Sequence, residues 1–131
     1  MAILAGAKID AADVIGLPAD ASAGTSIGSA SAGFTIVSAN FRAALNGKLV
    51  MWVATITSTN AITATAGNIA DTACLTLDAA LRPSEQQEFV WTGLMVGAGN
   101  IDPTTGVVEL RTASDSITAG MSIRLGAIYL K

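Results

Sequence analysis

Apolar and polar residues alternate with a period of two along much of the chain, which predicts β-strands. The clearest case is residues 48–58, where one set of alternating positions holds Val50, Trp52, Ala54 and Ile56, and the other holds Leu49, Met51, Val53 and Thr55. Successive side chains of a strand point to opposite faces, so both faces of this strand are apolar. We therefore expect it to be buried on both sides or to carry a subunit contact on one of them.

Further strands are predicted at residues 34–37, 41–45, 89–96, 107–113 and 121–131, with two short strands in 60–77 that break at Gly67-Asn68. In the last strand, Ile123, Leu125, Ala127 and Tyr129 share one face. Residues 19–33 are rich in Ala, Ser, Gly and Thr, which indicates a loop or an irregular edge strand. About eight strands with short polar turns favour an all-β, antiparallel β-sandwich or jelly-roll-like fold.

Two turns are predicted with a physical mechanism. Asn46-Gly47 is the best two-residue hairpin signal in the chain, because both residue types tolerate a positive φ. In the segment 102–106, Pro103 presets φ, Asp102 can bond forward to the turn backbone, and Gly106 can take the positive φ that closes the turn. Gly97-Ala98-Gly99 is interpreted as a bend.

Residues 1–18 are predicted to form an N-terminal anchoring segment, and 19–131 a single β-sandwich domain. A short helix is expected at residues 10–16, with Asp10 as its cap, Gly16 at its end and Pro18 preventing its continuation. This helix either covers one end of the core or docks on a neighbouring subunit or a particle. The candidate anchor residues are Ile3, Leu4, Ile9, Val14 and Ile15.

The chain is sparsely charged for its apolar content: 51% of its residues are hydrophobic and 13% are charged, against about 25% charged in typical soluble domains. Either Ser, Thr and Ala cover much of the surface, or part of the surface is an interface. We favour the interface, and expect a homo-oligomer. The strand at residues 48–58 is its predicted place, and the candidate interface residues are Met51, Trp52 and Val53.

Composition also argues against several partners. The net charge of −3 and the scattered basic residues do not match a nucleic-acid site, which clusters Lys and Arg. The longest uninterrupted apolar run, residues 49–54, is far too short to span a membrane, and the N-terminus lacks a signal-peptide pattern. A single cysteine allows no internal disulfide, and we expect a protein made in the cytoplasm.

The residues offer no catalytic site, and we expect no enzyme, metal or cofactor. The chain has no histidine, which removes the usual catalytic triads and the commonest transition-metal ligand. Cys74 is interpreted as a small core residue, and Glu85 and Glu88 as solvated loop carboxylates. A calcium site among the dispersed Asp residues stays open. Trp52, Trp91 and Tyr129 are expected to pack in the core or an interface, the alternative being stacking on sugar rings.

The order of motifs in the second half resembles a known family. It comprises Leu81-Arg82-Pro83, an apolar strand, Ile101-Asp102-x-x-x-Gly106-Val107-Val108-x-Leu110, and a final strand that ends in Ile128-Tyr129-Leu130. This order is similar to the β-sandwich knob modules at the ends of phage tail-fibre and minor tail proteins. The family's usual Leu-Pro-x-Gly-Tyr-Arg-Pro segment here lacks its Gly and Tyr. The opening residues 4–14, Leu-Ala-Gly-Ala-Lys-Ile-Asp-Ala-Ala-Asp-Val, also resemble the start of many small phage tail proteins.

This resemblance implies a non-enzymatic structural protein of a virion. It would form a symmetric oligomer, most simply a trimer, as a tail-fibre or minor-tail knob or as a capsid decoration protein. Its implied partners are further copies of itself and other virion proteins of the capsid or tail. The alternative is a carbohydrate-binding module that attaches to a host surface glycan, which would require exposed aromatic side chains on a concave face.

Overall fold

The computed structural model describes residues 22–131, which form nine β-strands and one short 3-10 turn, η2. The strands are β1 (Ser22–Gly24), β2 (Gly28–Ala30), β3 (Phe34–Ala44), β4 (Leu49–Ser58), β5 (Asn68–Leu77), β6 (Gln87–Thr92), β7 (Val96–Ile101), β8 (Val107–Thr112) and β9 (Ser122–Leu130), and η2 spans Ala79–Leu81. The predicted anchoring segment 1–18, its helix and its candidate anchor residues lie outside the described residues.

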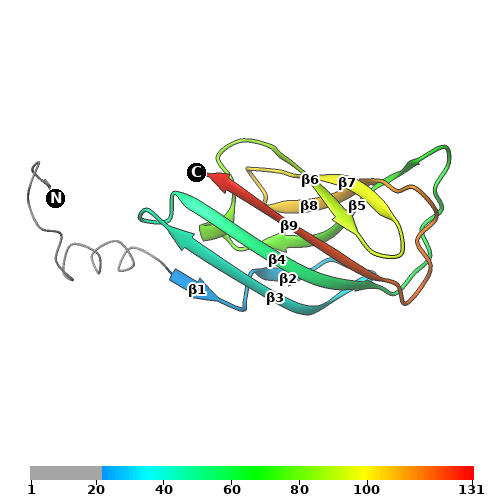
Figure 1. Ribbon diagram of the computed structural model, residues 1–131, viewed down its shortest axis with the longest axis horizontal. Helices are drawn as coiled ribbons and strands as arrows, with labels where there is room; N and C mark the ends of the chain where they lie inside the picture. Colours follow the sequence, from blue (N-terminus) through cyan, green and yellow to red (C-terminus); the bar gives the residue numbers. More distant parts are fainter. Residues whose placement is uncertain (1–21) are drawn as a thin grey trace, which may run out of the picture.

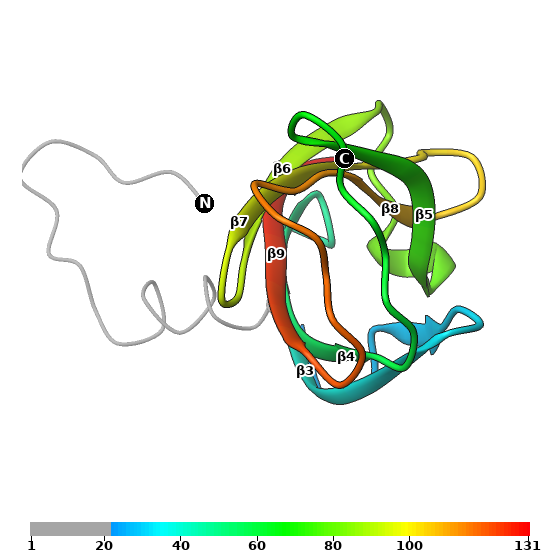
Figure 2. The same ribbon diagram turned by 90° about the vertical axis from the view of Figure 1, so that its right-hand side faces the viewer.

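All nine strands belong to one antiparallel sheet with the order β1-β3-β4-β9-β6-β7-β8-β5-β2. Only one residue pair, Thr92 with Arg124, joins β6 to β9, so the sheet consists of two walls. The first wall is β1-β3-β4-β9, and the second wall is β6-β7-β8-β5-β2. The two walls curve around a common core, and the strands encircle it when the molecule is viewed along its long axis (Figures 1 and 2).

The predicted all-β antiparallel class is confirmed, and nine strands are found where about eight were expected. The structure does not show two separate sheets, because hydrogen bonds run through β6 and β9 from one wall to the other. Consecutive strands β1 and β2 lie at the two opposite edges of the sheet. Residues 25–27 therefore pass from one wall to the other, and within them Ile27 is buried in the core at 1% exposure.

The predicted alternation in β4 is confirmed. Val50, Trp52, Ala54 and Ile56 are buried at 0–4% exposure, while Met51 and Val53 face outward. The Trp52 indole nitrogen donates a hydrogen bond to the Tyr129 hydroxyl at 3.1 Å, and that hydroxyl donates to the Leu81 carbonyl. The buried polar atoms of these two aromatic residues are thus satisfied, and they connect β4, β9 and η2 through the core.

Both predicted turns are confirmed. Asn46 and Gly47 have φ of 56° and 79°, and the Lys48 amide donates to the Leu45 carbonyl at 3.2 Å, which closes the hairpin between β3 and β4. In the second turn, the Asp102 carboxylate accepts hydrogen bonds from the amides of Thr104 and Thr105 at 2.7 and 2.8 Å. These amides stabilise the charged form, which lowers the pKa of Asp102 below its ordinary value.

The predicted strand at residues 89–96 is wrong, because it merges two strands. The chain turns at residues 93–95 between β6 and β7, and Gly97-Ala98-Gly99 lies within β7 instead of forming a bend. Trp91 pairs with Gly97, and Phe89 with Gly99. A Cβ atom built on Gly99 would lie 2.6 Å from Cζ of Phe89, and one on Gly97 would overlap the Trp91 ring. The glycines are there because the aromatic rings of β6 lie directly over β7.

Two other boundaries differ from the sequence prediction. The pieces predicted at residues 34–37 and 41–45 are one strand, β3, because a register shift between Ile36 and Ser38 absorbs the irregularity. Residues 60–67 do not form a strand of the sheet and make only isolated bridges, one of them between Ile62 and Ile117. The alternation of Thr with Ile and Ala at residues 62–65 has the period of a strand, and this pattern led to the prediction.

Candidate subunit interface

The outward faces of β4 and β9 together form an apolar surface. Strand pairing places Leu49 beside Leu130, Met51 beside Ile128, and Val53 beside Gly126. Met51 and Val53 are 38% and 44% exposed, and Ile128 and Leu130 are 65% and 66% exposed. We call this group (Leu49, Met51, Val53, Ile128 and Leu130) the apolar face. It follows directly from strand geometry, because the same two strands send their other side chains into the core.

The first wall is basic as well as apolar. Its four strands contain two charged residues, Arg42 on β3 and Arg124 on β9, and no Asp or Glu. Arg42 is paired with Met51 in the register and Arg124 with Thr55, so the two guanidinium groups flank the apolar face. Within residues 22–131 the only ion pair is Arg111 with Asp71, on the second wall, so neither flanking arginine has an acidic partner there.

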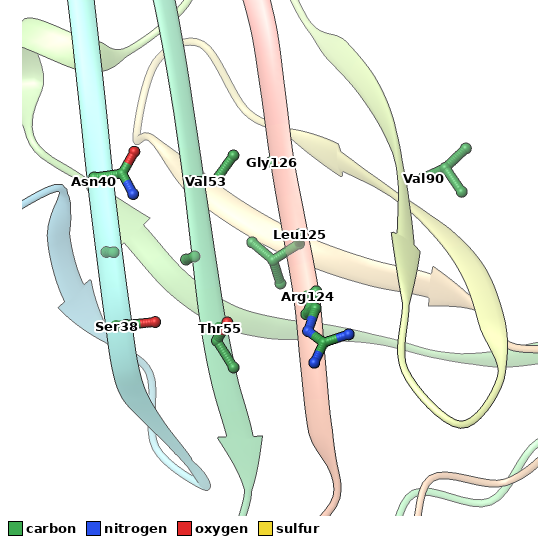
Figure 3. A pocket seen from close by; sticks show the side chains of 10 residues that line it. Ser38, Asn40, Val53, Thr55, Val90, Arg124, Leu125 and Gly126 are labelled. Carbon is green, nitrogen blue, oxygen red and sulfur yellow. The ribbon is translucent and has the colours of Figure 1, made fainter.

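Two hollows indent this surface. One, of about 490 Å³, lies where β6 diverges from β9. Figure 3 shows Val53 and Val90 on either side of Gly126, with Asn40 and Arg124 nearby. The other hollow, of about 340 Å³, lies toward the opposite end of β4 and is lined by Ser22, Ala23, Arg42, Leu49, Met51 and Ile128, among others.

The three residues predicted for an interface do not share one face. Met51 and Val53 belong to the apolar face, whereas Trp52 has 0% exposure and lies in the core. The assignment of Trp52 to a subunit contact is therefore wrong. Its neighbours in sequence point the other way, and its indole nitrogen already has a buried partner in Tyr129.

Sequence reasoning missed Ile128 and Leu130, which are the most exposed members of the apolar face. The alternation predicted for the last strand could have identified them. Ser122, Arg124 and Gly126 lie on the outer face, and the same spacing of two continues to Ile128 and Leu130. It also missed the apolar end of the hairpin between β6 and β7, where Val90, Leu94 and Val96 are 70%, 89% and 55% exposed. Those residues were hidden because the hairpin itself was not predicted.

The single cysteine of the chain lies in the core. Cys74 has 0% exposure and its thiol contacts the Val108 carbonyl at 3.3 Å, and burial raises the pKa of this thiol to about 12. Burial also raises the pKa of the Tyr129 hydroxyl to about 12. Residues 22–131 contain no group of three His, Cys, Asp or Glu side chains that could hold a metal ion.

The aromatic residues considered for sugar stacking are all in the interior. Trp52 and Trp91 have 0% exposure and Tyr129 has 5%. All three therefore pack in the core, which was one of the two placements expected from the sequence.

The described part of the chain has no helix with the length and apolar character needed to cross a membrane. Comparison with models of known protein families finds no match, and comparison with curated proteins finds none either.

Proposed function

We propose that this protein is a non-enzymatic structural protein of a phage virion that forms a symmetric homo-oligomer on the particle. The observation that carries the assembly part of this proposal is the apolar face on β4 and β9, which no described residue covers. Four of its side chains are 38–66% exposed, and exposing them to water is unfavourable unless a partner buries them. The virion part rests on the resemblance of the motif order in residues 81–130 to tail-fibre and minor-tail knob modules.

The architecture supports this proposal in a general way. Two antiparallel walls around one core suit a sandwich or jelly-roll-like module, which is the fold that the resemblance implies. Arg82 donates hydrogen bonds to the carbonyls of Leu77 and Thr104, which tie the segment before β6 to the end of β5 and to the turn between β7 and β8. We propose a trimer as a tail-fibre or minor-tail knob, or a capsid decoration protein, made in the host cytoplasm and bound to other virion proteins.

The oligomeric state tests the assembly part. Light scattering coupled to size exclusion of the full-length protein at micromolar concentration should give a mass that is a multiple of 13.1 kDa. Val53→Lys places a charge in the apolar face and should shift the mass toward the monomer. Val96→Lys is the matched control, because Val96 is a similarly exposed strand valine on the second wall, at 55% against 44%. A monomeric wild-type protein would rule out self-assembly.

The location on a virion needs a separate experiment. Protein labelled with a gold or fluorescent tag should bind to phage particles at one structural site, head or tail, when the particles are imaged by electron microscopy. Labelling that is absent from every part of the particle would contradict the virion proposal, even where the protein is oligomeric in solution.

A carbohydrate-binding module is the alternative. The aromatic side chains that would stack on a sugar are buried, which removes the platform that this function most often uses. The hollow in Figure 3 still brings Asn40, Arg124 and Val90 around one space, a size and polarity that a sugar ring could occupy. A glycan array distinguishes the two: specific binding that Asn40→Ala abolishes would favour the module.

A further inference from the structure

The described chain begins at the edge of the apolar face. Ser22, the first described residue, lines the 340 Å³ hollow together with Leu49, Met51 and Ile128. Twenty-one residues precede it in the sequence. A segment of that length spans up to about 70 Å when extended, about twice the length of a ten-residue strand. It is therefore long enough to lie along the whole face.

The preceding segment has the composition that this face would bind. Residues 1–21 contain three Asp side chains and one Lys, and their large aliphatic residues are Ile3, Leu4, Ile9, Val14, Ile15 and Leu17. The first wall has the complementary charge, because Arg42 and Arg124 are its only charged strand residues. Apolar and acidic side chains in one segment thus match an apolar surface flanked by two guanidinium groups.

A second copy of the same face is a poorer occupant. Face-to-face pairing around a two-fold axis brings the same patch of both subunits together. Arg42 and Arg124 of one copy would then meet the basic residues of the other, and the strands of the first wall bring no Asp or Glu between them from either copy. Like charges placed together in an interface oppose association.

The direction of the chain favours the face of a neighbouring copy over its own. Ser22 pairs with Ala43 in an antiparallel register, so the chain, followed backward from Ser22, runs toward the end of β3 and its turn at residues 45–48. A segment that continues in this direction would pass the end of the sheet, and it would have to reverse direction to lie on its own β4 and β9. We propose that residues 1–21 of one copy bind the apolar face of the next copy, a head-to-tail exchange that generates a closed ring.

This inference rests on the proposed self-assembly, and disulfide trapping in the full-length protein tests it. One tagged copy carries Ile9→Cys and a second, differently tagged copy carries Met51→Cys. Native Cys74 is fully buried and should not react. After mixing and mild oxidation, the two different tags should appear in one disulfide-linked band, and Val96→Cys in place of Met51→Cys should give at least about tenfold less of it.

The outcomes separate the two proposals. No link between the differently tagged copies in a protein that retains its oligomeric mass overturns the exchange and leaves self-assembly intact. The same applies if a link forms only within one chain that carries both cysteines. A monomeric mass overturns both the exchange and the proposed assembly.

Charge reversal provides a second, independent measurement. Arg42→Glu should weaken oligomerisation about fivefold in dissociation constant, as expected for one exposed ion pair. Asp13→Arg in the same chain should restore part of the lost affinity, because residues 1–21 of one copy then present a positive charge to the glutamate introduced at position 42 of the next copy. Arg111→Glu is the control, because its ion-pair partner Asp71 lies on the second wall. A dissociation constant unchanged by Arg42→Glu, as measured by sedimentation, would count against the proposal.

Discussion

The two walls of the sheet enclose one core but are built from different side chains. The first wall has large apolar residues on both faces of β4 and at the end of β9, so the apolar face lies over a hydrophobic interior. The second wall fills the core by laying Phe89 and Trp91 over the glycines of β7, and its exterior carries Glu88, Glu109 and the ion pair of Asp71 with Arg111. Its apolar exposure is confined to the end of the hairpin between β6 and β7.

This difference separates the requirements of folding from those of binding. A polar exterior is what a strand facing water needs, and the second wall largely meets that condition. An apolar exterior adds nothing to the stability of the isolated chain, which is why the apolar face supports the proposed subunit contact. Mutations on opposite faces of the same strand should therefore have different consequences.

The largest expected effect is on the inner face of β4. Trp52→Ala removes a fully buried indole and leaves the Tyr129 hydroxyl without its donor, and should lower the free energy of unfolding by about 3–5 kcal/mol. Met51→Ala, one position away on the apolar face, should change it by less than about 1 kcal/mol while weakening assembly. Urea denaturation at a concentration where both variants have the same oligomeric state makes the comparison. Equal losses at the two positions would mean that the faces are not functionally distinct.

The next effect concerns the glycines of the second wall. Gly97→Ala keeps an ordinary φ, but its Cβ atom would overlap the Trp91 ring and the Thr112 carbonyl. The backbone carbonyl of Thr112 cannot move away easily, so the free energy of unfolding of the variant should fall by about 1–3 kcal/mol, as in other overpacked cores. Thermal unfolding measures this loss. Ala98→Gly, the adjacent position in β7, serves as a control that alters the strand without crowding an aromatic ring. A neutral Gly97→Ala would show that Trp91 does not lie over β7.

A smaller effect is expected at the turn of the first wall. A Cβ atom on Gly47 meets nothing within 4 Å, so only the backbone angle of 79° opposes substitution there. Gly47→Val should cost about 1 kcal/mol, because a β-branched residue resists positive φ. Gly47→Asn should cost less, since Asn tolerates this conformation. Identical melting temperatures for the wild type and Gly47→Val would contradict the turn geometry.

The smallest effect at neutral pH is at Cys74 in the second wall. Burial raises the pKa of its thiol from 9.0 to about 12, so the folded state holds the proton more tightly than the unfolded state. That stabilisation is complete below pH 9 and is lost as the pH rises from 9 toward 12. Native protein at pH 7 should react with thiol reagents only after denaturant is added, and Cys74→Ala should reduce the loss of stability above pH 9. Rapid labelling of the native protein would mean that β5 is open to solvent.

The sequence alone was enough for the class of fold and for dividing the side chains of β4 into two alternating sets. Val50, Trp52, Ala54 and Ile56 could be placed together because strand side chains alternate regardless of what the strand packs against. The turns at Asn46-Gly47 and Asp102–Gly106 were predictable for a similar reason. They depend on the φ preferences and local hydrogen bonds of a few consecutive residues.

Only the tertiary structure decided which side of β4 is the interior, and so which of Met51 and Trp52 is free to meet a partner. Both sides are apolar, and the choice depends on the residues that the rest of the sheet presents, such as Tyr129, which accepts a hydrogen bond from the Trp52 indole. The glycines of β7 have the same explanation. In the sequence, these glycines indicate a bend. In the structure they are strand residues, because the aromatic rings of β6 occupy the space above them.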